Sequence, residues 1–191
     1  MKKIGITGGI GSGKTYVSEV FFSLGIPVFN ADVESNRLIR SSEKLKSLLK
    51  DSFGHDIYTN GILDKKKLAS IVFSDKEKLE NLNSIIHPIV KQKFKDWCKQ
   101  QNSSYVIKEA AILFESSSDK GLDAVICVSA PLNIRIDRAI KRDGSSEKEI
   151  KNRIENQISQ EEKENLSDYI IVNDGVQSLL PQILKIHQLL S

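Results

Sequence analysis

The sequence predicts an α/β fold, because patterns typical of strands and of helices alternate at both ends of the chain. Residues 2–7 (KKIGIT) have the pattern of a short strand that enters a glycine-rich loop. Residues 14–25 follow with apolar side chains at helical spacing and end in a glycine, as helices often do. Residues 26–32 (IPVFNAD) have the pattern of a second strand. A strand, a helix and a strand within about 30 residues form a βαβ unit, which implies a parallel sheet.

The middle of the chain, residues 33–102, changes character and predicts a helical insertion. Three stretches there are polar on one side and apolar at steps of three and four residues, which is the pattern of amphipathic helices. These stretches are residues 40–53, 63–73 and 75–101. Between the first two, residues 54–62 contain Gly54, Asn60 and Gly61, and we expect a loop.

The α/β pattern returns in the last part of the chain and completes an expected five-stranded parallel sheet flanked by helices. One of these helices opens at Pro131, a residue that fits the first turn of a helix. The expected strands are residues 104–112, 122–130 and 168–174, the expected helices are 131–142 and 176–190, and a charged hairpin lies at 145–165.

Length and composition are those of an ordinary globular protein, with 191 residues, 39% hydrophobic and 28% charged. A net charge of +3 is too small to argue for nucleic acid or an anionic membrane as a partner. No apolar run approaches the ~18 residues of a spanning helix, and no apolar segment follows the first lysines as in a signal peptide. The cysteines, Cys98 and Cys127, are isolated, as in reduced proteins. We therefore expect a cytoplasmic protein, as a monomer or weak homo-oligomer.

The glycine-rich loop matches the phosphate-binding P-loop pattern, G-x-x-x-x-G-K-[ST], from Gly8 to Thr15. Glycines allow backbone angles that turn successive N–H groups inward, and the following helix adds its positive N-terminal end. Lys14 supplies a mobile cation for the β- and γ-phosphates, and the Thr15 hydroxyl can bind Mg²⁺. A chance match would arise in roughly one chain per hundred of this length. Because the loop here lies between an expected strand and an expected helix, we predict a nucleotide site in a P-loop NTPase fold.

P-loop proteins of this size are mainly nucleotide-gated switches or small-molecule kinases. A switch GTPase would carry a guanine-reading N-K-x-D segment, and the sequence has none. A small kinase needs an acid beside the acceptor, an acid that organises the metal, and a mobile cationic lid. The residues that follow favour the kinase.

Two acidic residues fit these roles. Asp32 ends the second expected strand, at the edge where parallel strands face their ligands, so its carboxylate can orient an acceptor hydroxyl and take its proton. The alternative is that Asp32 caps the next helix. Glu109 falls within an apolar strand, where a charge needs a partner. That partner is either Mg²⁺, bound directly or through water, or a lysine in a buried ion pair.

Arginines gather in one part of this lysine-rich chain. The chain has six arginines against 22 lysines, and four of the six lie between residues 135 and 153. Arg135, Arg138 and Arg142 step by three and four residues and so share one helix face. The planar arginine fork suits phosphate oxygens, so we expect a phosphate-binding lid. The alternative is a solvated face paired with Asp137 or Asp143.

The chain resembles the dephospho-CoA kinase family almost from end to end. The resemblance includes ITGGIGSGKT, LGIPVFNAD, the long segment 61–90, ILFE, and the stretch from 138 to 175 that ends in DYIIVNDG. Segment 61–90 is the most specific part, because the chemistry of a P-loop does not require it. The resemblance implies transfer of the γ-phosphoryl group of ATP to the ribose 3′-hydroxyl of dephospho-CoA, with Mg²⁺, as the final step of coenzyme A synthesis.

The resemblance also implies how the chain is organised. A P-loop core would comprise residues 1–32, 103–142 and 167–191, a helical region that binds the CoA substrate would comprise 33–102, and a short helical lid would comprise 143–166. Within this scheme, Asp32 matches the acid proposed to handle the acceptor hydroxyl, and Arg138 and Arg142 match lid arginines beside the phosphates held by Lys14. Thr15 and Glu109 are the candidate metal ligands, and residues 173–175 would approach the adenine. The nucleotide loop is Gly8, Gly11, Ser12, Gly13, Lys14, Thr15 and Tyr16.

The sequence departs from the family pattern at four positions, one of which is Ala111 in place of a proline. Asn30 replaces the first acid of the common DAD motif, and Asn36 replaces an arginine. Glu109 replaces an aspartate, which keeps the charge but extends it by one methylene and favours a water-mediated metal contact. A nucleoside or nucleotide kinase, and a non-catalytic nucleotide-dependent binding module, are the alternative functions.

Overall fold

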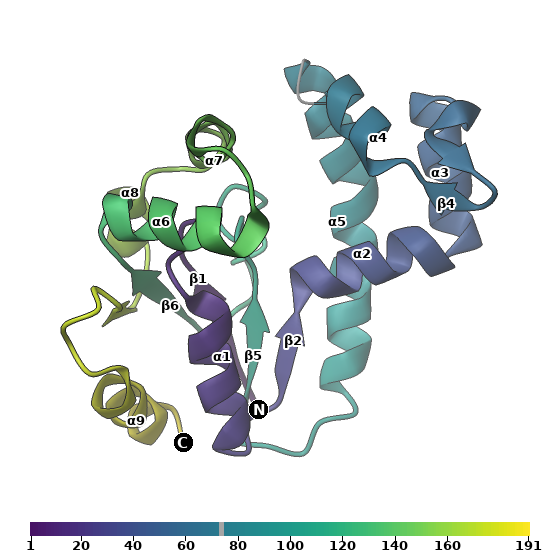
Figure 1. Cartoon of the computed structure of the whole chain (residues 1–191). Coiled ribbons are helices and arrows are strands. Elements are labelled where there is room, and N and C mark those ends of the chain that lie inside the picture. The colour runs from purple at the N-terminus through teal and green to yellow at the C-terminus, as the bar shows by residue number, and fades with distance from the viewer. Residues whose placement is uncertain (73–74) are drawn as a thin grey trace. The chain divides into compact units, whose positions relative to one another are not determined.

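The computed structural model describes residues 1–72 and 75–191, and the chain divides into two compact units. The first, which we call the sheet unit, joins Met1–Asn30 to Gln100–Ser191. The second, the helical unit, is the intervening segment Ala31–Lys99 (Figure 1).

The sheet unit contains the five-stranded parallel sheet that the sequence predicts. Its strands are β1 (Lys2–Thr7), β2 (Val28–Asn30), β5 (Tyr105–Glu109), β6 (Ala124–Ser129) and β7 (Tyr169–Val172). They lie in the order β2-β5-β1-β6-β7, so β1 occupies the centre and pairs with β5 and β6. Because all the strands run in one direction, the carboxyl ends at Thr7, Asn30 and Glu109 meet at the same edge.

Helices cover this sheet, and two of them pack side by side: the helix after the glycine-rich loop and the C-terminal helix (Figure 1). The helices of the unit are α1 (Lys14–Ser23), α6 (Leu132–Asp143), α7 (Glu147–Glu155), α8 (Gln160–Asn165) and α9 (Leu179–Leu190). Pro181 lies in the first turn of α9, where its missing N–H would have no helical partner. The charged hairpin expected over 145–165 forms α7 and α8. Helix α7 begins at a reciprocal capping box between Ser146 and Glu149.

The apolar core of the sheet unit has two parts. The larger cluster lies between the sheet and the helices α1 and α9, and its members include Ile4, Phe21, Tyr105, Ile126 and Ile183. The smaller cluster joins the glycine-rich loop to α6 and α7, through Ile10, Ile136, Ala139 and Ile150. The loop is therefore fixed by apolar packing as well as by its backbone.

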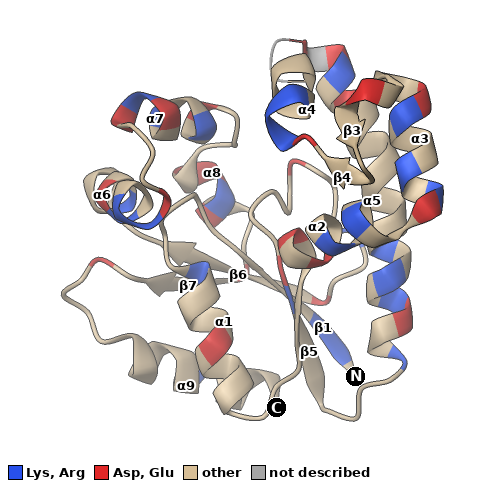
Figure 2. Cartoon of the chain, turned by 45° about the vertical axis from the view of Figure 1, so that its right-hand side comes forward, with Lys and Arg blue, Asp and Glu red and all other residues tan. Residues whose placement is uncertain are grey.

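The helical unit begins directly after β2. Its elements are α2 (Ala31–Ser41), α3 (Glu43–Phe53), a 3₁₀ turn η1 (His55–Ile57), β3 (Tyr58–Thr59), β4 (Ile62–Leu63), α4 (Lys65–Val72) and α5 (Lys76–Cys98). Helices α3 and α5 carry both basic and acidic side chains, and the charged side chains of α4 are lysines (Figure 2). On the inner side of the unit, Leu45, Leu49, Leu68 and Val72 are buried. The helix expected over 63–73 corresponds to α4, and residue 73 lies outside the described residues.

Two expectations for this region are corrected by the structure. Strand β2 ends at Asn30, so Asp32 lies in the first turn of α2 and does not end a strand. A carboxylate in a first turn is stabilised by the positive end of the helix, which favours this boundary. The segment 54–62, expected to be a loop, contains the 3₁₀ turn and a small hairpin. Asn60 and Gly61 form its tip, both with positive φ (51° and 77°).

Within the part of the chain that the structure describes, no helix combines the length and apolar character needed to cross a membrane.

Candidate active site

The glycine-rich loop has the backbone that a phosphate-binding nest requires. Gly11 and Gly13 have φ values of 77° and 92°, in the region that favours glycine. Gly13 is also the N-cap of α1. A Cβ atom on Gly11 would overlap the backbone carbonyl of Arg135, so the loop and α6 approach too closely for any side chain there. The backbone conformation therefore favours glycine at both positions, and the close approach of α6 also excludes a side chain at Gly11.

The first turn of α1 presents hydrogen-bond donors at the end of this loop. Lys14 and Thr15 are its first two residues, and the N–H groups of a first turn have no partner within the helix. Together with the helix dipole, they form a site for an anion. Thr15 and Tyr16 are exposed, so a bound phosphate would have access from solvent.

Thr15, Glu109 and Asn30 form one hydrogen-bonded group at the carboxyl edge of the sheet. The Thr15 hydroxyl donates to Glu109 Oε1 (2.6 Å), and Asn30 Nδ2 donates to Glu109 Oε2 (2.8 Å). Glu109 is only 2% exposed. Asn30 and Glu109 lie opposite each other in the register of β2 and β5. The sequence predicted Thr15 and Glu109 as site residues, but it did not predict that Asn30 would bind Glu109.

The identity of residue 30 has a chemical consequence. An amide at this position can donate to the Glu109 carboxylate, whereas an ionised aspartate could only accept. Asn30 therefore stabilises a buried acid beside the phosphate loop, where a second carboxylate would repel it.

This group fits a magnesium ion bound mainly by phosphate oxygens and water. Because the Thr15 hydroxyl donates its hydrogen bond to Glu109, the lone pairs of its oxygen can face a cation. Among the described residues, no three His, Cys, Asp or Glu side chains are grouped to hold a metal. Magnesium commonly binds nucleotide sites through one or two protein oxygens together with phosphates and water.

Arg138 is linked to the loop through Asn173. Its guanidinium donates to the backbone carbonyl of Asn173 (3.0 Å) and to Asn173 Oδ1 (3.3 Å). Asn173 Nδ2 in turn donates to the carbonyl of Ser12 (2.8 Å). The structure thus brings together α6, the segment after β7 and the glycine-rich loop.

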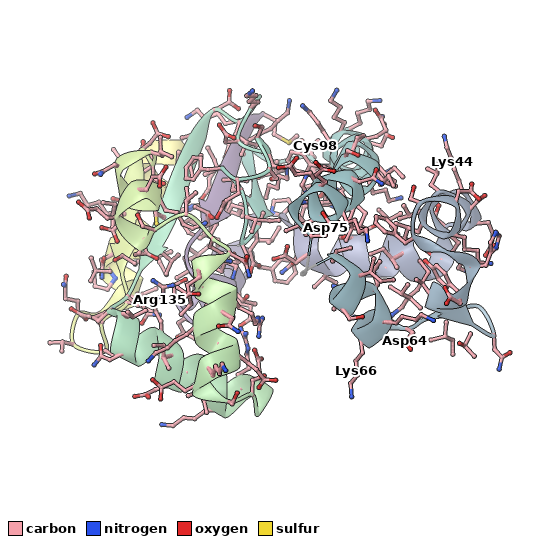
Figure 3. The ribbon with its side chains drawn as sticks, turned by 90° about the horizontal axis from the view of Figure 1, so that it is seen from above. Lys44, Asp64, Lys66, Asp75, Cys98 and Arg135 are labelled. Carbon is pink, nitrogen blue, oxygen red and sulfur yellow. The ribbon has the colours of Figure 1, made fainter. Side chains whose placement is uncertain are left out.

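Arg135 lies against the same loop and is almost completely buried, at 4% exposure (Figure 3). Its Nε donates to the carbonyl of Ile10 (3.1 Å), and its guanidinium lies where a Cβ on Gly9 would be. Burial lowers the pKa of the Arg135 guanidinium from its ordinary value. Arg135 therefore does not belong to a solvated arginine face and instead packs beneath the loop.

Arg142 has a different environment at the end of α6. Its side chain is 57% exposed and makes two hydrogen bonds to Asp143 (2.7 and 3.0 Å). Arg153 of α7 reaches the same carboxylate (2.7 Å). The hydrogen bond from Arg142 and the neighbouring Arg153 lower the pKa of Asp143 to about 2. In this structure Arg142 thus has the ion-pair partner that the sequence left open as an alternative.

Asp32 belongs to the helical unit. It is exposed on the first turn of α2, and its backbone carbonyl accepts a hydrogen bond from Asn36 Nδ2 (2.8 Å). Asn36 Oδ1 also accepts from Lys65 (2.9 Å). Asn36 therefore ties α2 to the start of α4.

Comparison with known proteins decides the family. A family model described as dephospho-CoA kinase matches residues 2–178. The chain belongs to the dephospho-CoA kinase family. The dephospho-CoA kinase of Bacteroides fragilis is 40% identical over 185 residues, which are 96% of this chain and 90% of the relative.

Solved structures agree with this assignment. A crystal structure of a Thermus thermophilus protein has a TM-score of 0.86 at 33% identity, and the match covers 98% of this chain and 96% of that one. A dephospho-CoA kinase from Campylobacter jejuni matches with a TM-score of 0.68 at 26% identity, with the same coverage. The resemblance seen in the sequence and the P-loop kinase fold are both confirmed. Dephospho-CoA kinases are transferases that use ATP as phosphoryl donor with Mg²⁺ in the final step of coenzyme A biosynthesis.

Proposed function

We propose that this chain phosphorylates the ribose 3′-hydroxyl of dephospho-CoA in the cytoplasm. Its nucleotide loop with Lys14 would bind the donor, and Asp32, Arg138 and Arg142 would act in the transfer. The observation that carries the proposal is the Thr15–Glu109–Asn30 group, because a hydroxyl held by a buried carboxylate at the start of α1 is suited to a cation beside bound phosphates. Family membership supplies the acceptor.

On the donor side, the N–H groups of the loop hold the phosphates, and Lys14 neutralises charge on the β- and γ-phosphates. Thr15 would bind Mg²⁺ through its hydroxyl oxygen, and Glu109 would orient that hydroxyl and water around the ion. When bound, Mg²⁺ supplies neutralisation of the developing phosphate charge. Asn30 keeps the Glu109 carboxylate in place for this role.

On the acceptor side, Asp32 would accept a hydrogen bond from the 3′-hydroxyl and take its proton as the new P–O bond forms. The helical region 33–102 would hold the rest of dephospho-CoA. Arg138 and Arg142, with helix α7 of the lid 143–166, would close over the γ-phosphate and exclude water. For this, Arg142 would release the Asp143 carboxylate and bind a phosphate oxygen instead.

The acceptor is tested by ADP release from Mg·ATP with dephospho-CoA, nucleosides and nucleoside monophosphates offered in turn. We expect stimulation by dephospho-CoA alone. Stimulation by a nucleoside or a nucleotide instead would make the protein a kinase of that acceptor. No acceptor-dependent release would make it a nucleotide-dependent binding module.

The role of Asp32 is tested by Asp32→Asn. We expect kcat to fall about 100-fold or more, the usual scale of acid–base assistance, with little change in ATP binding. Asp51→Asn, an exposed aspartate of α3, is the matched control. Turnover of Asp32→Asn close to that of the control would remove Asp32 from the mechanism.

The role of Glu109 is tested by Glu109→Gln, which keeps the shape of the side chain and removes its charge. We expect kcat to fall about 100-fold and the Mg²⁺ concentration for half-maximal rate to rise, because the ion loses its organising acid. Glu19→Gln, an exposed residue of α1, is the control. An unchanged Mg²⁺ dependence would contradict a metal-organising role for Glu109.

A further inference from the structure

Two N–H groups at the start of the phosphate loop are already occupied by side chains. The N–H of Gly9 donates to Gln160 Oε1 (3.1 Å), and the N–H of Ile10 donates to Gln157 Oε1 (3.2 Å). Gly9 and Ile10 are buried, so neither group can turn to bulk water. While the glutamines hold them, these two N–H groups do not bind a phosphate.

The amide of Gln160 is held in one orientation by its other contacts. Its Nε2 donates to Glu164 Oε1 (3.0 Å), to Cys127 Sγ (3.2 Å) and to the carbonyl of Val128 (3.5 Å). The Ser129 hydroxyl also donates to Glu164 Oε1 (2.5 Å). Because these groups lie on β6 and α8, the oxygen of Gln160 is directed at the loop by the sheet itself.

An ion pair between a buried lysine and a partly exposed glutamate fixes the segment that carries both glutamines. The Lys163 side chain is fully buried, and its Nζ donates to Glu115 Oε1 (2.6 Å) and to the carbonyl of Ala111 (3.0 Å). Glu115 Oε1 also accepts from the N–H of Ile158, next to Gln157 (3.2 Å). Helix α8 is thus fastened to the loop that follows Glu109.

We propose that Gln157 and Gln160 are positioning residues for nucleotide binding, which hold the phosphate loop in its binding-competent form before the nucleotide arrives. Their side-chain oxygens fix the N–H groups of Gly9 and Ile10. The N–H of Ser12 donates to the carbonyl of Gly9 (3.1 Å), so the part of the loop that follows is anchored to a residue that Gln160 holds in place. Helix α8, placed in the lid by the sequence, then acts as part of the nucleotide site. The inference rests on the proposed function only in taking the ligand to be ATP or ADP.

The physical reason is preorganisation. Without an acceptor, a buried N–H must find another partner, and the glycines of the loop allow it to do so by rearranging. If the loop adopts its binding-competent form only part of the time, its affinity for the nucleotide falls in proportion to the fraction of molecules in that form. Catalysis in the bound state, by contrast, uses groups that the glutamines do not touch.

The test uses Gln157→Met, Gln160→Met and the double variant in the full chain, because methionine keeps the length of the side chain and removes the acceptor. Gln188→Met, an exposed residue of α9, is the matched control. Calorimetry measures the Kd of Mg·ADP, and steady-state assays with dephospho-CoA measure KM for ATP and kcat. Loss of one hydrogen bond of ordinary strength predicts a rise of about five- to tenfold in Kd and KM for each single variant. We expect kcat to change by less than about twofold and the control to match the wild type.

Three results would overturn the inference. One is an unchanged Kd for Mg·ADP in both single variants. The second is a fall in kcat with KM unchanged, which would indicate a smaller folded fraction. The third is an equal rise in Kd for the control. If the wild type binds Mg·ADP but does not phosphorylate dephospho-CoA, the proposed function fails while the role of the glutamines can still be measured from Kd.

Discussion

Helices α7 and α8 follow each other in the chain and both carry charges of both signs (Figure 2), yet they are attached to the sheet unit differently. On α7, Lys151 pairs with Glu147 at the surface (2.7 Å), and Ile150 is the fully buried side chain. On α8, Lys163 is itself fully buried and reaches Glu115. The content of charged residues therefore does not show how firmly a helix is attached to the core. What differs here is whether the charged side chain is exposed, as on α7, or buried, as on α8.

Lys163→Met should give the largest loss of unfolding free energy. It is the most direct test of the difference between α7 and α8. The buried ammonium group makes two hydrogen bonds, to Glu115 and to the carbonyl of Ala111, and both would be lost. Each hydrogen bond of a charged group contributes about 1.5–3 kcal/mol to the unfolding free energy. Lys151→Met makes the same change in an exposed pair on α7 and should cost at most about 1 kcal/mol. Denaturant unfolding of both variants measures the difference. Equal losses would show that α8 is attached no more firmly than α7.

Ile150→Ala should have the next largest effect, because it removes the apolar contact of α7 with Ile10, Ile136 and Ala139. Truncation of a buried isoleucine costs about 2–5 kcal/mol, and we expect the lower end because α7 can detach locally. Native-state hydrogen exchange should show faster exchange in α7 with little change in α8. Faster exchange in both helices alike would mean that they open as one lid.

Asp143→Asn should have the smallest effect, at most about 1 kcal/mol, because the pairs with Arg142 and Arg153 are partly exposed. The pKa of Asp143 is lowered to about 2 in the folded protein, below its unfolded value of about 4. Its contribution to stability is therefore present above about pH 4 and is lost as the pH falls towards 2. Thermal melts of both proteins over this range measure it. A stability difference that persists at the acidic end would assign the effect to something other than this carboxylate.

The sequence predicted the parts of the fold that local patterns determine. The P-loop, the βαβ unit and the five parallel strands follow from glycine spacing and hydrophobic periodicity, which act over a few residues. Thr15 and Glu109 could be named because a P-loop hydroxyl and a charge in a buried strand are each recognisable alone. The end of β2 was misplaced by two residues, since the first turn of α2 starts directly after Asn30.

The residues that support the loop could not be predicted in this way. Gln157 and Gln160 lie 147 and 151 positions from their partners. A glutamine in a charged segment has no sequence pattern that indicates an acceptor for a backbone N–H. Arg135 shares a helix face with Arg138 and Arg142, yet close approach to Gly9 and Gly11 buries it alone. The register of β2 and β5 was needed to find that Asn30 binds Glu109. Tertiary geometry alone supplies these contacts.

The central position of β1 affects the order in which the chain can assemble during synthesis. Lys2 pairs with Tyr105 and Ile4 pairs with Ala124, so both neighbours of this strand are made more than 100 residues later. At roughly 5–20 residues per second, a nascent β1 waits on the order of ten seconds for them. Residues 31–99 have their own compact set of contacts and emerge within that interval. We therefore expect the helical unit to take shape on the ribosome while the phosphate loop is still attached to an unpaired strand.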